Sequence, residues 1–237
     1  MSSDCFQFKQ FCVHHDRCSM KVGTDGVLLG CWAFACDLPH SAQGPILDIG
    51  TGSGLIALML AQRFPNASIT GIDIDLPSVE QARENVAQSP FRNSMEILHI
   101  GLEAFEAGGY QRIVSNPPFY EEDTHSKTEQ MHNAKHTTSL TFDALAAGVD
   151  RLLDKEGEFD VIVPYAAAER FIGVAATHGL FLVRRCDVKG SMTRPFKRSM
   201  MAFCREPRET EHTLLIIRTP QNTYSEEYIR LTQDFYL

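Results

Sequence analysis

The sequence has no apolar run approaching the ~18 residues of a membrane-spanning helix. Its first residues are polar, and no basic stretch leads into an apolar one, so the pattern of a secretion signal is missing. A hydrophobic fraction of 43% and a charged fraction of 22% over 237 residues are ordinary for a globular chain. These features predict a cytoplasmic protein whose single domain spans residues 1–237.

Paired cysteines of the Cys-x-x-Cys type are also missing, which argues against a zinc ribbon or a redox motif. The seven cysteines are scattered, and we expect unpaired thiols in a reducing compartment. His125, His132 and His136 lie in a polar stretch without the spacing of a structural zinc site. We therefore expect no bound metal.

A basic overall charge is absent, because the formal net charge is −8. Nucleic-acid enzymes are often basic, since neutralising phosphates supplies much of their affinity. The balance is uneven, however, and the segment 184–208 is rich in basic residues: Arg184, Arg185, Lys189, Arg194, Lys197, Arg198, Arg205 and Arg208. A solvated charged face and an RNA-binding patch explain this segment equally well.

Short apolar runs alternate with helical patterns and without internal repeats, which is typical of a parallel sheet covered by helices. The expected strands cover 46–49, 68–73, 95–100, 112–115, 157–163, 180–188 and 199–205, with a strand-like stretch at 213–217. The expected helices cover 54–63, 77–88, 141–153, 166–177 and 225–234. The polar stretch 120–138 has no periodicity and predicts a long functional loop.

A glycine-rich turn follows the first of these strands. Asp48 ends the apolar run, and Gly50, Gly52 and Gly54 follow it directly before a helix. Glycines allow a tight turn and the close approach of a ligand to the backbone. The context of strand, glycines and helix therefore predicts a nucleotide-binding loop. Residues 52–57 also satisfy the looser G-x-G-x-x-A pattern of dinucleotide sites.

An acid ends the next strand, as such a site requires. Asp73 lies 23 residues after Gly50, and Asp75 follows it. A carboxylate at this position accepts hydrogen bonds from both hydroxyls of an unphosphorylated ribose. That geometry suits either NAD or S-adenosylmethionine, so two classes of enzyme stay open at this point.

The motif Asn116-Pro117-Pro118-Phe119 separates the two classes. It follows an expected strand, so it should lie at the carboxyl edge of the sheet beside the cofactor. The Asn116 side-chain oxygen and the Pro117 carbonyl can accept the two N–H groups of an amine on an sp² carbon, which localises its lone pair. The prolines hold these acceptors in place, and Phe119 offers a ring on which a flat base can stack. The motif predicts methylation of such an amine, with Asn116, Pro117 and Phe119 as the catalytic residues.

The chain resembles the bacterial methyltransferases that modify the adenine N6 just 3′ of the anticodon of a valine tRNA. The likeness is carried by the segments 8–11, 20–30, 48–54, 116–119, 224–226 and 231–237. It implies a Rossmann-like class I methyltransferase, with a seven-stranded, mostly parallel sheet and helices on both faces. It also implies a cofactor, S-adenosylmethionine, and a partner, tRNA. Residues 1–40 would form an N-terminal segment and lid, and residues 41–237 the core with C-terminal strands.

The resemblance also assigns site residues. In relatives the 20–30 block closes over the methionine end of the cofactor. The cofactor-binding candidates are therefore Lys21, Thr24, Asp25, Asp48, Gly50, Gly52, Gly54, Asp73 and Asn116. The substrate-binding candidates are Phe119, Tyr120, Arg194, Lys197 and Arg198, with Lys127 and Lys135 as further basic residues. One departure is Leu102, which stands where many such enzymes have an acid that meets the cofactor's adenine, so Glu103 or a backbone group would take that contact.

Three alternatives stay open. The same chemistry serves a guanine amine in ribosomal RNA or a glutamine side chain in a protein, because both present an NH₂ on an sp² carbon. A nicotinamide-dependent oxidoreductase leaves the Asn-Pro-Pro-Phe motif unexplained. An inactive RNA-binding protein with this fold would not need both the glycines and that motif. A monomer is the expected state.

Overall fold

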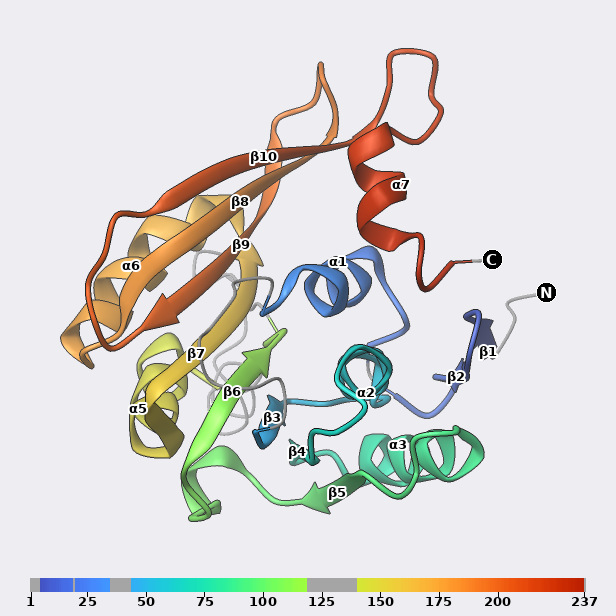
Figure 1. Cartoon of the computed structure of the whole chain (residues 1–237), viewed down its shortest axis with the longest axis vertical. Helices are drawn as coiled ribbons and strands as arrows, with labels where there is room; N and C mark the ends of the chain where they lie inside the picture. The colour runs from blue at the N-terminus through green and yellow to red at the C-terminus, as the bar shows by residue number, and fades with distance from the viewer. Residues whose placement is uncertain (1–4, 19, 35–43, 119–139, 237) are drawn as a thin grey trace, which may run out of the picture.

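The computed structural model describes residues 5–18, 20–34, 44–118 and 140–236. Its main sheet has eight strands in the order β10-β8-β9-β7-β6-β3-β4-β5 (Figure 1). The strands are β3 (Ile46–Ile49), β4 (Ile69–Asp73), β5 (Met95–His99), β6 (Tyr110–Ser115), β7 (Leu153–Pro164), β8 (Phe181–Ser191), β9 (Phe196–Cys204) and β10 (Glu211–Arg218). Strand β9 is antiparallel to both of its neighbours, and all other pairings in this sheet are parallel.

Helices cover both faces of this sheet, which confirms the expected class of fold. Figure 1 shows α5 and α6 on one face and α1, α2, α3 and α7 on the other. Their bounds are α1 (Thr24–Trp32), α2 (Leu55–Arg63), α3 (Leu76–Gln88), α5 (Phe142–Leu152), α6 (Ala168–Thr177) and α7 (Glu226–Thr232), with short 3-10 turns η1 (Leu102–Ala104) and η2 (Tyr165–Ala167).

Strand residues alternate between two cores because successive side chains point to opposite faces of a sheet. Ile46 packs with Leu28 and Ile56 on the side of α1 and α2. Leu47 belongs to the other core, with Leu145 and Phe171 on the side of α5 and α6. All four residues of β3 are buried, as expected for a parallel strand covered on both faces.

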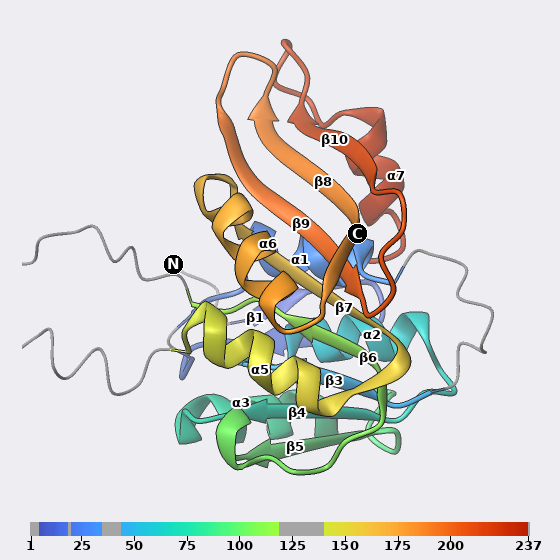
Figure 2. The same cartoon turned by 90° about the vertical axis from the view of Figure 1, so that its left-hand side faces the viewer.

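The strand count differs from the expected seven, because the tail strand joins the sheet. β10 pairs in parallel with β8 and forms the edge. Together β8, β9 and β10 extend beyond α6, as Figure 2 shows. The stretch 213–217 was recognisable as strand-like, but its pairing partner was not.

A two-stranded hairpin precedes the sheet, with β1 (Cys5–Gln7) antiparallel to β2 (Cys12–His14). Cys5 and Cys12 form a disulfide across it, so the expectation that all thiols are unpaired is wrong for these two. The hairpin brings the two cysteines together by register, which their spacing in the sequence does not reveal. Within the described ranges, the side chains grouped closely enough to share a metal ion are Cys5, Cys12 and His14, and the disulfide removes both thiolates.

None of the helices in the described part of the chain combines the length and the apolar character needed to cross a membrane.

Candidate active site

The glycine-rich turn lies at the carboxyl end of β3, directly before α2. Gly50, Gly52 and Gly54 have φ angles of +71°, +54° and +80°, in the left-handed region that side chains with a Cβ adopt at a cost. A Cβ added at Gly50 or Gly52 would meet no atom within 4 Å, so open space lies beside this backbone. A Cβ at Gly54 would touch Ala82 of α3 at 3.4 Å. Two of the glycines therefore face space for a ligand, and the third lets α2 pack on α3.

Asp73, at the end of β4, anchors the same turn. Its Oδ2 accepts a hydrogen bond of 2.8 Å from the Gly52 N–H, and its Oδ1 accepts one of 2.9 Å from the Asp75 N–H. Each carboxylate oxygen can accept more than one hydrogen bond, so Asp73 can still accept from a ligand hydroxyl. Asp75 has a separate task, because it caps α3 through the Ser78 N–H.

Asp48 lies fully buried on β3, below the turn. Thr51 Oγ1 donates a 2.7 Å hydrogen bond to its Oδ2, whereas its Oδ1 has no partner. Burial raises the pKa of the Asp48 carboxyl to about 7, although the hydrogen bond from Thr51 acts in the opposite direction. A buried acceptor without a partner is costly, and a cationic ligand group would satisfy it.

Two helices direct their N-termini to this edge of the sheet. Neither α1, which follows Gly23, nor α2, which follows Gly54, has a side-chain cap. Their first N–H groups are therefore available to an anion such as a carboxylate, apart from the Ala57 N–H of α2, which donates to Asp48. A Cβ at Gly26 of α1 would lie 3.0 Å from Leu55 Cδ2 and 3.9 Å from Asn116 Nδ2. The small residue at 26 thus allows α1 to approach both α2 and Asn116.

Asn116 follows β6 at the same edge. Ser115 precedes it and donates a 2.9 Å hydrogen bond to the Ile49 carbonyl, which ties the end of β6 to the start of the glycine turn. Pro117 is buried and Pro118 is exposed. Phe119 and Tyr120, the predicted base-binding aromatics, lie outside the described residues. The structure therefore brings together Asp48, the glycine turn, Asp73 and Asn116.

The predicted lid residues differ in their surroundings, since two are exposed to solvent and the third forms an ion pair. Lys21 and Thr24 are exposed, with Thr24 at the start of α1. The Asp25 carboxylate accepts a 2.6 Å hydrogen bond from Arg198 Nε on β9. This ion pair joins a predicted cofactor residue to a predicted RNA-binding residue, and it neutralises both charges.

The basic segment is not one surface. Arg184 and Arg185 are buried, and they pair with acids on β7, α6 and β8: Glu158, Asp160, Glu169 and Asp187. Arg205 pairs with Asp150. Arg194 is exposed in the turn between β8 and β9, and Lys197 is exposed near the start of β9. The interpretation of the segment 184–208 as a single patch is therefore wrong. Arg184 reaches toward α1 and Arg185 toward α6, and both are buried because helices cover both faces of the sheet.

Leu102 confirms the departure noted in the sequence, because its side chain is buried in η1 against α5. A Cβ at Gly148 of α5 would lie 2.5 Å from Leu102 Cδ2. Glu103 is exposed in the same turn. Leu102 thus packs into the core on the α5 side and offers no polar group to a ligand.

Asn85 is a residue that sequence reasoning missed. It is fully buried on α3 and bridges the N-terminal hairpin to the glycine turn. Its Oδ1 accepts from the His14 N–H at 3.0 Å, and its Nδ2 donates to the carbonyls of His14 and Ser53 at 2.8 and 2.9 Å. A polar residue on the apolar face of an expected helix was the available signal.

We expect Asn85→Ala to lower the free energy of unfolding by about 2–3 kcal/mol, because it leaves buried backbone groups of His14 and Ser53 without partners. Since Ser53 belongs to the glycine turn, we also expect weaker cofactor binding. Urea unfolding and calorimetric titration measure the two effects. Gln88→Ala, at an exposed position of the same helix, is the control and should change stability by less than about 0.5 kcal/mol. Lost stability with unchanged cofactor affinity would limit Asn85 to a structural role.

Comparison with known proteins agrees with this geometry. Residues 24–165 match the model of the family described as methyltransferase small domain. A predicted O-methyltransferase from Agrobacterium tumefaciens superposes with a TM-score of 0.70 at 16% identity, covering 89% of this chain and 96% of that one. A ribosomal protein L11 methylase from Lactobacillus delbrueckii subsp. bulgaricus gives 0.53 at 19% identity, with 76% and 77% covered. Fold and site thus define a class I methyltransferase, whose methyl donor is S-adenosylmethionine.

Relatives similar over their full length narrow the class. Proteins named tRNA1(Val) (adenine(37)-N6)-methyltransferase are 42% identical in Flavobacterium psychrophilum, over 98% of this chain and 99% of the relative. The corresponding values are 45%, 100% and 99% in Phocaeicola vulgatus, and 41%, 98% and 95% in Vibrio parahaemolyticus. This chain belongs to the family of tRNA1(Val) (adenine(37)-N6)-methyltransferases.

The residues present fit the methyl donor. The orphaned Asp48 Oδ1 suits its ammonium group, and the uncapped N-termini of α1 and α2 suit its carboxylate. The space beside Gly50 and Gly52 suits a ligand that lies against the backbone. Each of these features is otherwise an unmet polar group or an unfilled volume.

Proposed function

We propose that this protein methylates the exocyclic N6 of adenine 37 in a tRNA1(Val), with S-adenosylmethionine as the donor. The observation that carries the proposal is the place of Asn116. It follows β6 at the carboxyl edge of the sheet, beside the glycine turn and 3.9 Å from the Cβ position of Gly26. The full-length similarity to relatives of that name supports the choice of substrate.

Each cofactor-binding residue is assigned to a different chemical group of S-adenosylmethionine. Asp73 would accept from the ribose hydroxyls, and the unpartnered Oδ1 of Asp48 would accept from the ammonium group. The N–H groups at the start of α1, beginning with Thr24, receive the carboxylate, while Lys21 and Asp25 belong to the lid above it. Gly50 and Gly52 leave room for the ligand to lie against the backbone, and Gly54 leads directly into the N-terminus of α2.

The catalytic residues act on the amine of the base. The Asn116 side-chain oxygen accepts one N–H, and the Pro117 carbonyl accepts the other. Two acceptors draw the amine toward tetrahedral geometry and localise its lone pair, which is otherwise delocalised into the ring. Phe119 stacks on the base and aims this lone pair. When bound, S-adenosylmethionine supplies an electrophilic methyl group. No strong base is needed, because the nitrogen becomes acidic once it is alkylated.

We expect cofactor affinity to depend on pH through Asp48. Its carboxyl has a raised pKa of about 7, so it is largely protonated at pH 6 and largely ionised at pH 8. Only the ionised form pairs with an ammonium group, so the dissociation constant should rise about tenfold per pH unit as the pH falls below 7. Titration calorimetry between pH 5.5 and 7.5 measures this slope. Asp48→Asn should bind more weakly and show a flat profile, and the same slope in that variant would contradict the assignment.

The substrate is tested by incubation with radiolabelled S-adenosylmethionine and bulk tRNA that lacks this modification, followed by nucleoside analysis. Label in N6-methyladenosine, and none after adenine 37 is replaced by guanine in a tRNA1(Val) transcript, is the expected result. Label in ribosomal RNA or in glutamine residues of protein instead would assign a different substrate to the enzyme. The fold and the Asn116 mechanism would be unaffected by that result. Transfer to none of them would favour an inactive RNA-binding protein.

We further propose that the protein works without a metal as a single-domain monomer in the cytoplasm, where its tRNA substrate is found. Residues 1–40 would form the N-terminal segment and lid, and residues 41–237 the core with its C-terminal strands. Light scattering coupled to size-exclusion chromatography tests the oligomeric state. Activity that survives a chelator tests the absence of a metal.

A further inference from the structure

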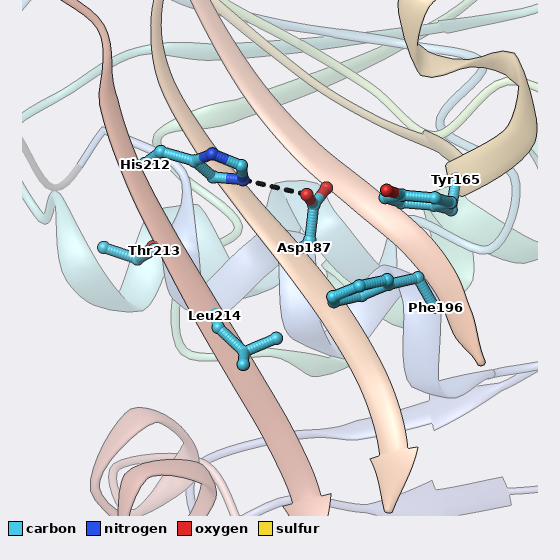
Figure 3. Close-up of a pocket in the computed structure, with 6 residues that line it drawn as sticks. All are labelled: Tyr165, Asp187, Phe196, His212, Thr213 and Leu214. Atoms are coloured by element: carbon cyan, nitrogen blue, oxygen red, sulfur yellow. Dashed lines mark hydrogen bonds and ion pairs between the residues drawn. The ribbon is translucent and has the colours of Figure 1, made fainter. Parts of the chain in front are cut away.

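A cavity separate from the glycine turn opens on the C-terminal strands of the sheet, β8 to β10. It has a volume of about 300 Å³ and is lined by Tyr165, Asp187, Phe196, His212, Thr213 and Leu214. Figure 3 shows the rings of Tyr165 and Phe196 stacked on each other, with their tips directed toward Asp187 and β10. No step of the proposed reaction uses this cavity.

The cavity lies close to the catalytic motif in the fold. β6 and β7 are neighbours, with Ser115 opposite Val161. From Val161, β7 continues to Pro164 at this edge, and Tyr165 follows immediately. Phe196 starts the next strand, β9, about 4.8 Å further along the sheet. Tyr165 thus lies one strand away from the end of β6 and Phe196 two strands away, at the same edge of the sheet.

A β-bulge orients Phe196 into this cavity. The pairing of β8 with β9 shifts where Val188 faces Arg198 and Lys189 faces Phe196, so Lys197 is the extra residue. Without the bulge, alternation would direct Phe196 to the opposite face of the sheet, with Met200 and Ala202. Bulges are frequent next to active sites because they redirect side chains.

The walls combine flat apolar surfaces with hydrogen-bonding groups. The two ring centroids are 4.7 Å apart with 22° between the planes, and Tyr165 is 37% exposed. Leu214 is 50% exposed on the other side. His212 Nε2 lies 2.8 Å from Asp187 Oδ2, and if Nε2 carries the proton, the neutral ring presents Nδ1 as an acceptor. The Tyr165 hydroxyl adds a donor and acceptor at the ring tips.

Lys189 supplies positive charge beside the aromatic pair, whereas the charge of Arg185 is neutralised by its ion pairs with Asp187 and Glu169. The Lys189 ammonium is 4.3 Å from the Phe196 ring centroid, and the Arg185 guanidinium carbon is 5.5 Å from that of Tyr165. The Asp187 carboxylate is held by Ser199 and Arg185 at Oδ1 and lies 2.8 Å from His212 Nε2 at Oδ2. Aromatic ring edges, polar groups and the Lys189 ammonium together match a nucleobase on a phosphate backbone.

We propose that this cavity binds one unpaired base of the RNA substrate, next to the adenine that is methylated. The inference rests on the proposed function, since it takes the RNA to be the substrate. The base lies between the tips of the Tyr165–Phe196 pair and the side chains of His212 and Leu214, and Lys189 approaches its phosphate. Contacts of a base with aromatic side chains, and of its phosphate with a cation, depend little on the RNA sequence.

Replacing both rings by leucine tests the proposal. Tyr165→Leu with Phe196→Leu keeps apolar bulk and removes the aromatic ring edges together with the Tyr165 hydroxyl. We expect about a tenfold weaker dissociation constant for an unmodified tRNA1(Val) anticodon stem-loop, measured by filter binding with S-adenosylhomocysteine present. The KM for this RNA should rise by the same factor, while kcat and cofactor affinity stay unchanged. Phe196→Trp should retain the affinity of the native protein.

Two controls make the result specific. Tyr224 is another exposed aromatic residue, 47% exposed, with Arg218 over its ring and Tyr228 of α7 stacked on it. The variant Tyr224→Leu should leave RNA affinity unchanged. Stem-loops with one abasic nucleotide on either side of the target adenine identify the base concerned. The native protein should bind one of these abasic stem-loops about tenfold more weakly than the intact stem-loop. The double variant should bind the abasic and the intact stem-loops equally well, because it has already lost the contact. Undiminished RNA affinity in a folded double variant would overturn the proposal. RNA binding is measured without methyl transfer. A failure of this cavity to bind the base can therefore be distinguished from a failure of the protein to methylate tRNA.

Discussion

Asn116→Ala should lower the rate of methyl transfer by about 10²–10³-fold, the loss typical when one preorganised polar partner of a reacting group is removed. The affinity for S-adenosylmethionine should change little, because Asp48, Asp73 and the glycine turn stay in place. Single-turnover kinetics with saturating RNA measures the rate, and calorimetry measures the affinity.

Asn116→Asp is the matched variant. A carboxylate keeps an acceptor oxygen of the same reach, so this protein should retain more activity than the alanine variant. Equal loss in both would mean that Asn116 acts through its N–H₂ group or through the backbone. Full activity of Asn116→Ala would reject the proposed mechanism, whatever the substrate.

Gly52→Ala should weaken the binding of S-adenosylmethionine by about 10–100-fold, because its Cβ would enter the volume that the ligand occupies. The φ angle of +54° adds a conformational cost of about 1–2 kcal/mol to folding. Since no protein atom lies within 4 Å of the new Cβ, the variant should still fold. Calorimetric titration and thermal unfolding distinguish the two effects.

Gly173→Ala is the control for this change. Gly173 lies exposed in α6, where an added Cβ also meets nothing within 4 Å, but its φ angle is not positive. Alanine there should raise stability by about 0.5–1 kcal/mol and leave cofactor binding unaltered. Unchanged cofactor affinity in Gly52→Ala would show that the donor does not lie against the turn.

Local patterns predicted much of this protein. The strand that ends at Asp48, the glycines after it and the acid at Asp73 are consecutive in the chain, and their chemistry depends on neighbouring residues. Parallel strands place their carboxyl ends at one edge, so even the approach of Asn116 to the glycine turn was predictable. The class of fold and the methyl donor followed from these features and from the Asn-Pro-Pro-Phe motif, and the location of the site stays a prediction.

The tertiary structure decided what depends on partners distant in the chain. Arg184 and Arg185 look like surface cations in the sequence, yet buried acids on β7 and β8 pair with them. Asn85 bridges two backbone segments that only folding brings together. The bulge that turns Phe196 into the second cavity arises from the pairing of β8 and β9.

The sequence by itself determined the chemistry of the methyl donor site, since each of its residues belongs to a short motif with a local conformational requirement. Only the tertiary structure decided which charges stay at the surface, which thiols meet and where the RNA finds a second contact. These properties depend on strand order and register, and a one-residue shift in register sends a side chain to the opposite face of the sheet.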